Sequence, residues 1–130
     1  ALYYRWTFAK DSILNARRFT EEFLWFPGTP AALLRGFVRN RQARTYMREE
    51  GVTPGNRRDV EKHYLDELDD LQALFGERPF LFGQRPSLAD FGLFASMFRH
   101  FSIDPTPARI MRDRAPAVYE WVARTWNARA

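Results

Sequence analysis

Apolar residues recur at intervals of three and four along most of this 130-residue chain, and this spacing most constrains its fold. A helix presents one face at such intervals, whereas a half-buried strand alternates apolar and polar residues one by one. No alternating pattern persists in the sequence. The spacing therefore predicts an all-α fold without a sheet.

The first helical run should extend from Leu2 to Phe23 as about six continuous turns. Its expected core stripe is Leu2, Trp6, Ala9, Ile13, Ala16, Phe19 and Phe23. Pro27-Gly28-Thr29-Pro30 should end it, because two prolines and a glycine cannot continue a helix. A second helix should start there, with Thr29 as N-cap and Pro30 as first helical residue, and end at Gly51. Its expected apolar side is Leu33, Leu34, Phe37, Val38, Tyr46 and Met47.

A third helix is expected over residues 56–75, followed by Gly76 in the left-handed conformation. Its core stripe should be Val60, Tyr64, Leu68, Leu71 and Phe75. The apolar segment 79–83 should form a buried connector to the next helix.

The fourth helix should open with a capping box formed by Ser87 and Asp90. In such a box the Ser87 hydroxyl accepts from the Asp90 backbone N–H, and the Asp90 carboxylate accepts from the Ser87 N–H. The residues that follow are nearly all apolar until Arg99. A helix that is apolar all round is typical of a central, buried position.

Two further helices complete the expected fold. A short one should follow the segment Asp104-Pro105-Thr106-Pro107, capped by Asp104 or Thr106. The last should start at Pro116, with one side formed by Val118, Trp121, Val122, Thr125 and Trp126. The sequence thus predicts a helical bundle of five main helices and a short one around a buried central helix, in a single domain over residues 1–130.

Composition excludes several classes of protein. Hydrophobic residues make up 45% of the chain and charged residues 28%, which is typical of a globular domain. The chain has no cysteine, which excludes a disulfide scaffold, a thiolate zinc site and a cysteine nucleophile. No apolar run approaches the roughly 18 residues of a membrane helix. His63 and His100 are far apart without neighbouring ligand clusters, so we expect no metal site.

The charges are segregated along the sequence. Residues 31–58 contain seven arginines against two glutamates, and residues 59–77 contain seven acidic residues against one lysine. These blocks are either two solvated helix faces that attract each other or a basic surface for a partner or an anionic substrate. This distribution argues against nucleic acid as a partner, although the net charge is +4.

Three segments together resemble the C-terminal helical domain of bacterial glutathione S-transferases. They are Arg78-Pro79-Phe80-Leu81-Phe82-Gly83-Gln84-Arg85-Pro86-Ser87-Leu88-Ala89-Asp90-Phe91, Asp104-Pro105-Thr106-Pro107 and Ala115-Pro116-Ala117-Val118-Tyr119-Glu120-Trp121-Val122. The first resembles the loop and Ser/Thr-x-x-Asp box that open the central helix in this family. The resemblance covers essentially the whole chain.

The resemblance implies a second domain outside this chain. In the family, a thioredoxin-like N-terminal domain binds glutathione and supplies the residue that activates its thiol. This chain begins at Ala1 within a helical pattern, so we expect it to be part of a longer protein. By itself it should bind no cofactor and be catalytically inactive, with glutathione as a co-substrate of the full-length protein. The resemblance also implies a cytoplasmic homodimer.

In the family, the first helix forms much of the wall for the hydrophobic co-substrate. The resemblance therefore directs attention to a second stripe on that helix, formed by Tyr4, Phe8, Asp11, Ser12 and Asn15. Aromatic rings beside small polar groups suit a cleft that holds an apolar electrophile. The alternative is that Tyr4 and Phe8 pack against the second domain or a second subunit. Ser87 and Asp90 are interpreted as structural, and no catalytic residue is assigned.

Two functions of different classes follow. The first is the helical domain of a glutathione transferase, which conjugates the glutathione thiolate to small hydrophobic electrophiles in detoxification. The second is a non-enzymatic adaptor or interaction domain of the same fold, because fold alone does not decide function. The arginine-rich second helix favours the adaptor slightly. A purely structural dimerisation domain is a third possibility.

Overall fold

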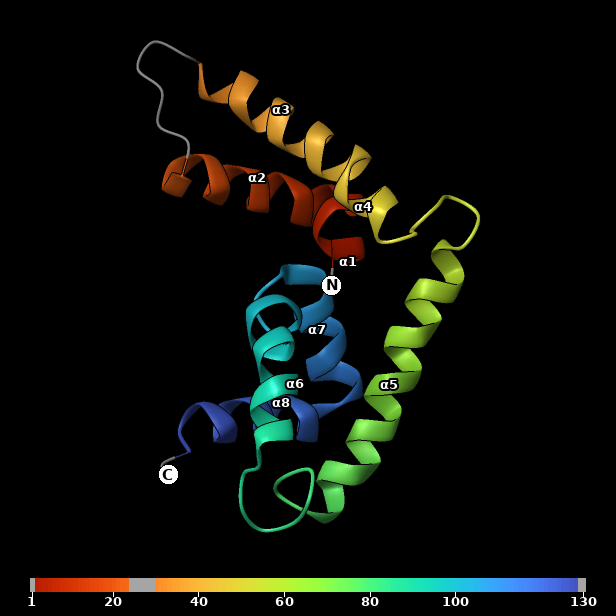
Figure 1. Cartoon of the computed structure of the whole chain (residues 1–130), viewed down its shortest axis with the longest axis vertical. Helices are drawn as coiled ribbons and strands as arrows, with labels where there is room; N and C mark the ends of the chain where they lie inside the picture. The colour runs from red at the N-terminus through yellow and green to blue at the C-terminus, as the bar shows by residue number, and fades with distance from the viewer. Residues whose placement is uncertain (1, 24–29, 129–130) are drawn as a thin grey trace. The chain divides into compact units, whose positions relative to one another are not determined.

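A computed structural model of the chain describes residues 2–23 and 30–128, apart from the side chains of Leu2 and Phe23 (Figure 1). The described residues form helices and connecting turns, and none of them lies in a strand. The expectation of an all-α fold is confirmed. The chain divides into two compact units, residues 1–60 and residues 61–130. The expected single domain stays a prediction.

The first unit contains α1 (Leu2–Thr7), α2 (Ala9–Phe23), α3 (Ala31–Arg44) and α4 (Tyr46–Glu49). Helices α2 and α3 lie side by side (Figure 1). The expectation of one continuous helix over residues 2–23 was wrong, because the chain bends at Phe8. Just before the bend, the Thr7 hydroxyl donates to the Tyr3 carbonyl. Such bonds from a hydroxyl to its own helix often bend the helix.

The buried face of α2 is not the expected apolar stripe. Ile13 is 55% exposed and Ala9 is also exposed, although Trp6 and Ala16 are buried. The buried polar residues of α2 are Asp11, Ser12, Asn15 and Thr20. Short polar side chains tolerate burial when they bond to their own helix backbone, as Thr20 does to Ala16 at 3.0 Å.

Helix α3 begins at Ala31. The expectation of Pro30 as its first helical residue was wrong, because Pro30 is in the N-cap position with a ψ of 126°, and it makes no side-chain capping bond. The expected break at residues 27–29 and the Thr29 cap lie outside the described residues. Val38 and Met47 are buried as expected, but Leu33 is 67% exposed and Phe37 is 62% exposed. Those two residues therefore do not belong to the core of this unit.

The expectation of one helix up to Gly51 was wrong, because a turn at Thr45 divides it into α3 and α4. Gly51 follows the end of α4 as expected, with a φ of +73° that favours glycine. Its N–H donates to the Arg48 carbonyl, and the Val52 N–H donates to the Met47 carbonyl at 2.9 Å. These two bonds form a Schellman motif, which satisfies the last carbonyls of the helix.

Helix α5 (Arg57–Glu77) carries the expected core of the second unit, with Tyr64, Leu68, Leu71 and Phe75 all buried. Val60 is only half-buried. The expected left-handed Gly76 was wrong, because α5 continues through it to Glu77 and its φ is not positive. The left-handed glycine of this region is Gly83 instead, which bridges to Phe80 in a tight turn.

The connector before α6 is buried only in part, because Phe80 is buried and Phe82 is 77% exposed. Helix α6 (Leu88–Ser96) then runs into η1 (Met97–Phe101), a single π-helical turn. The expectation of a central helix buried all round was wrong. Asp90 and Met97 are buried, whereas Leu88 is 91% exposed. One side of this apolar helix thus packs within its unit, and the side that carries Leu88 is open to solvent.

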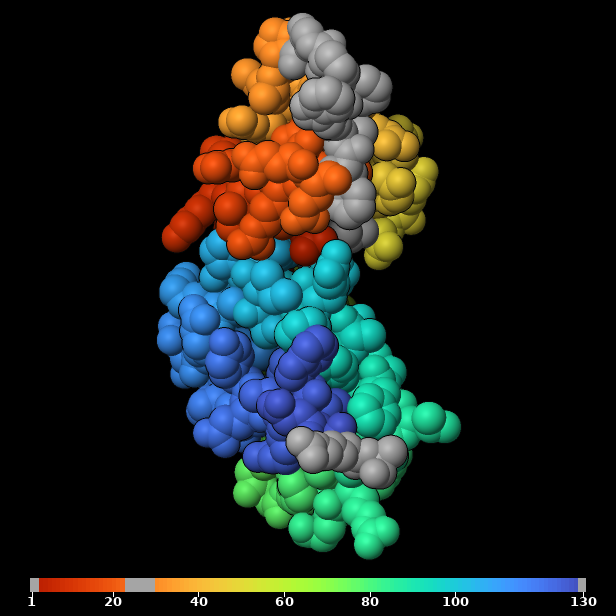
Figure 2. Space-filling view, turned by 90° about the vertical axis from the view of Figure 1, so that its left-hand side faces the viewer, coloured from red at the N-terminus to blue at the C-terminus, as the bar shows by residue number. Residues whose placement is uncertain are grey.

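Helices α7 (Pro105–Arg114) and α8 (Pro116–Trp126) each have a proline in the first turn, as expected. Asp104 is the N-cap residue of α7 by position, but its buried side chain makes no capping bond. Along α8, the expected core residues Val118, Trp121, Val122 and Thr125 are buried. Trp126, however, is 63% exposed. Helix α8 lies against α6 within this unit (Figure 2).

Candidate functional site

The stripe expected to face a co-substrate begins with a cluster of rings at the bend between α1 and α2. The Tyr4 and Phe8 ring centroids are 5.2 Å apart, and Tyr3 meets Phe8 edge to face at 5.7 Å. Tyr4 is 1% exposed, whereas Phe8 is half-buried. Phe8 is therefore the more accessible of the two rings expected in the wall.

The polar members of the stripe are held within the first unit. Ser12 donates to the Ala9 carbonyl at 3.1 Å and accepts from the Arg39 Nε at 3.2 Å. The Asn15 amide donates to the Asp11 carbonyl at 2.9 Å. All three polar residues are buried. The structure thus brings the five stripe residues onto adjacent turns, and a co-substrate role for them stays a prediction.

The capping box at the start of α6 is present as expected. The Ser87 hydroxyl accepts from the Asp90 N–H at 3.4 Å, and the Asp90 carboxylate accepts from the Ser87 N–H at 2.9 Å. The Ser87 hydroxyl also donates to the same carboxylate at 2.6 Å. The backbone of Ser87 is extended, with φ −117° and ψ 169°, as an N-cap requires.

Asp90 has two further partners that sequence reasoning missed. Its carboxylate accepts from the Leu81 N–H at 2.8 Å and from the Trp121 indole N–H at 3.0 Å. Burial raises the pKa of Asp90, but the hydrogen bonds from Ser87, Leu81 and Trp121 outweigh it, so the pKa lies below its ordinary value. Asp90 therefore joins the connector, α6 and α8 through one buried charge.

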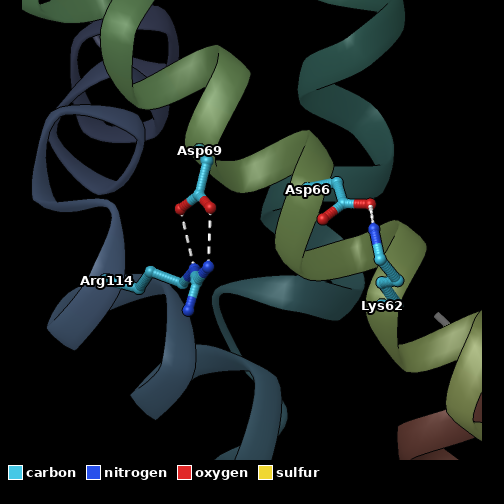
Figure 3. Close-up of polar contacts among 4 residues, drawn as sticks. All are labelled: Lys62, Asp66, Asp69 and Arg114. Atoms are coloured by element: carbon cyan, nitrogen blue, oxygen red, sulfur yellow. Dashed lines mark hydrogen bonds and ion pairs between the residues drawn. The ribbon is translucent and has the colours of Figure 1, made fainter.

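The acidic block is largely a solvated helix face. On α5, Lys62 pairs with Asp66 one turn away (Figure 3). Arg114 of α7 holds Asp69 through two bonds of 2.7 and 2.6 Å, in the forked geometry of a guanidinium and a carboxylate (Figure 3). The hydrogen bond from Arg114 lowers the pKa of Asp69 despite the opposing effect of burial. Both pairs lie within the second unit.

The basic block contributes to a hollow in the first unit, which sequence reasoning did not locate. The hollow has a volume of about 630 Å³. Arg44, Arg48 and Arg57 line it together with Trp6. The run of arginines was visible in the sequence, but the packing of α1 beside α4 decides which of them line a hollow with Trp6.

The described residues contain no group of three or more His, Asp or Glu side chains placed to hold a metal ion. His63 is exposed on α5, and His100 lies in the π-helical turn. Within the described ranges, no helix is both long and apolar enough to cross a membrane.

Comparison with known families assigns the chain to a class of helical domains. Residues 41–124 match the family described as glutathione S-transferase, C-terminal domain. This match includes the capping box and most of the helices from α4 to α8. The chain therefore belongs to this family. No curated protein and no solved structure matches the chain.

Proposed function

We propose that this chain is the helical domain of a glutathione transferase-like enzyme. In that enzyme the thiolate of glutathione attacks an electrophilic carbon and displaces a leaving group such as chloride, or adds to a polarised double bond. A thioredoxin-like domain outside this chain would bind glutathione and activate its thiol. The helical domain would form part of the wall for the hydrophobic co-substrate and part of a homodimer interface.

The observation that carries this proposal is the family match over residues 41–124. The ring cluster at the α1–α2 bend supports the assignment of the wall. Phe8 offers a partly accessible apolar surface, as the wall of a hydrophobic co-substrate cleft requires. Ser12 and Asn15 are buried and bonded within the first unit, so they would hold this wall in place from behind.

The test uses the full-length protein and 1-chloro-2,4-dinitrobenzene with glutathione. We expect release of chloride and formation of the thioether, together with retention of the protein on immobilised glutathione. Absence of both turnover and retention would argue against the enzyme and in favour of a non-enzymatic domain of the same fold.

A matched pair of variants tests the wall. Phe8→Ala should raise KM for the chloronitrobenzene about three- to tenfold, because it removes apolar contact area worth about 1 kcal/mol or more. Ile13→Ala changes an exposed apolar residue of α2 and should leave KM unchanged. Equal kinetics in the two variants would exclude Phe8 from the co-substrate wall.

The exposed arginines of α3 and α4 favour the adaptor as the second candidate. An adaptor that uses this basic surface on RNA should bind with an affinity that falls steeply as salt increases. Negligible binding that is insensitive to salt would remove this candidate.

A further inference from the structure

We propose that the arginine-lined hollow of the first unit is a binding site for a small organic anion with an apolar body. The hollow lies where α1, the end of α3, α4 and the first turn of α5 come together. All of its lining residues belong to residues 1–60. The proposal rests on these residues, and it does not depend on the proposed transferase function.

The size and apolar lining of the hollow suit a small molecule. Its volume of about 630 Å³ lies within the range of about 300–1,000 Å³ that is usual for ligand pockets. Trp6 and Met47 contribute buried side chains, and Val52 and Pro54 add apolar surface. An aromatic or aliphatic body would lie against this apolar part of the lining.

The charged residues that line the hollow are all basic. Arg44, Arg48 and Arg57 line it, and none of its described lining residues is acidic. Among the described side chains, none of these three guanidinium groups forms an ion pair. Because a guanidinium group binds carboxylate and phosphate oxygens with two parallel N–H groups, the site has charge-assisted donors available for an anion.

The start of α5 adds to this positive potential. Arg57 is its first residue, and the helix is 21 residues long, so its N-terminal N–H groups favour negative charge nearby. The Asn56 side chain is occupied by the preceding loop: its oxygen accepts from the Thr53 N–H at 2.8 Å, and its amide donates to the Gly51 carbonyl at 2.9 Å. These bonds fix the loop that forms one wall of the site.

A second hollow of about 300 Å³ shares Trp6 and Ala43 with the first. It adds Arg39 from the preceding turns of α3. Trp6 therefore lines both hollows, with three arginines at the first and Arg39 at the second. This arrangement fits a ligand whose apolar body lies against Trp6 and whose acidic group reaches the arginines. A carboxylate and a phosphate monoester share this chemistry.

The experiment follows the indole N–H signals of the four tryptophans by ¹⁵N NMR while phenyl phosphate or benzoate is added to the chain. The Trp6 signal is assigned with Trp6→Phe. We expect a saturable shift of the Trp6 signal with a Kd of about 1 mM or tighter, and no such shift at Trp121 or Trp126. The stronger of the two probes identifies the preferred acid. Benzyl alcohol, which lacks the charge, should bind at least about tenfold more weakly.

Two double variants with equal net charge test the arginines. Arg44→Gln with Arg48→Gln should weaken binding of the better probe about tenfold, because two guanidinium contacts are lost. Arg41→Gln with Arg58→Gln changes neighbouring arginines outside the lining and should change Kd by less than about twofold. A circular dichroism spectrum checks that both variants remain helical.

Three results would overturn the proposal. They are no saturable shift at Trp6 with either acid, equal binding of benzyl alcohol, and equal weakening by both double variants. The last would indicate attraction to the whole basic segment instead of a defined site. None of them bears on conjugation by the full-length protein, so the two proposals fail independently.

Discussion

At the scale of single residues, Asp90 connects three segments of the second unit. Its carboxylate is fully buried and accepts four hydrogen bonds, two from Ser87 and one each from Leu81 and Trp121. A buried charge is stable only when such donors replace water. This bonding supports the interpretation of Asp90 as a structural residue, which its place in a capping box predicts.

Asp90→Ala should lower the free energy of unfolding by about 3 kcal/mol, because it leaves several buried donors without an acceptor. Ser87→Ala should cost less, about 1 kcal/mol, since the carboxylate keeps its other donors. Urea denaturation followed by circular dichroism measures both values. Asp113→Ala changes an exposed aspartate and serves as the control, with an expected effect within about 0.5 kcal/mol. A loss at Asp90 no larger than at Asp113 would contradict this role.

The depressed pKa of Asp90 predicts how stability depends on pH. The ordinary pKa is 3.8, and the folded state holds it lower. The stabilisation is thus complete above the unfolded pKa and is lost as pH falls through 3.8 toward the folded value. The difference in unfolding free energy between the natural chain and Asp90→Asn should shrink between about pH 5 and pH 3. A constant difference across this range would show that the charge of Asp90 has no part in it.

Tyr64 should resist ionisation at alkaline pH. Its hydroxyl donates to the Pro107 carbonyl at 3.1 Å, its ring stacks on Phe101, and burial raises its pKa above the ordinary value of 10.0. Because the folded pKa is the higher one, its stabilisation is complete below about pH 10 and is lost as pH rises beyond it. Absorbance at 295 nm should show fewer tyrosines titrating near pH 10 in the folded chain than in urea, and Tyr64→Phe should reduce that difference by one tyrosine. An unchanged difference in Tyr64→Phe would contradict the burial of this hydroxyl.

At the scale of helices, one glycine lies inside a helix and another lies at a helix end. Gly76 lies within α5 with open space where an added methyl group would lie, so Gly76→Ala should stabilise the chain by about 0.5–1 kcal/mol. Gly51 has a φ of +73°, so Gly51→Ala should destabilise it by about 1 kcal/mol. Thermal unfolding of the two variants checks the opposite signs. Equal signs would contradict the assigned helix ends.

The sequence predicted the positions of the helices more accurately than the faces that these helices bury. Periodicity located the cores of α5 and α8 because their apolar stripes are unambiguous. It failed on α2, where hydrogen bonds to the helix backbone make burial of Ser12 and Thr20 possible. It also failed at Gly76, since a glycine near a helix end does not show by itself whether the helix continues.

The features of the candidate sites also differ in whether the sequence alone could predict them. The capping box was predictable because its two residues are three positions apart, as local geometry requires. The bond from Trp121 to Asp90 spans 31 residues and depends on the packing of α8. The arginine-lined hollow likewise depends on which residues of α4 and α5 line it beside Trp6. Contacts between distant segments are set by tertiary packing, which spacing in one sequence does not encode.

At the scale of the whole molecule, the chain exposes large apolar side chains that should drive self-association. In the second unit these include Phe82, Leu88, Phe91 and Trp126. Sedimentation velocity should show association that increases with concentration, and Leu88→Gln with Phe91→Gln should reduce it. Ile13→Gln changes an exposed apolar residue of the other unit and is the control. A strictly monomeric profile at all concentrations would contradict the prediction.

The hydrogen-bond partners of Asp90 become available at different times during synthesis, since a protein is synthesised from its N-terminus. Leu81 and Ser87 precede Asp90, so these donors are available when the carboxylate leaves the ribosome. Trp121 follows 31 residues later, which takes roughly 2–6 seconds at about 5–20 residues per second. During that interval the nascent chain holds a carboxylate whose last partner does not yet exist. The second unit can therefore complete its core only after the chain has been synthesised through α8.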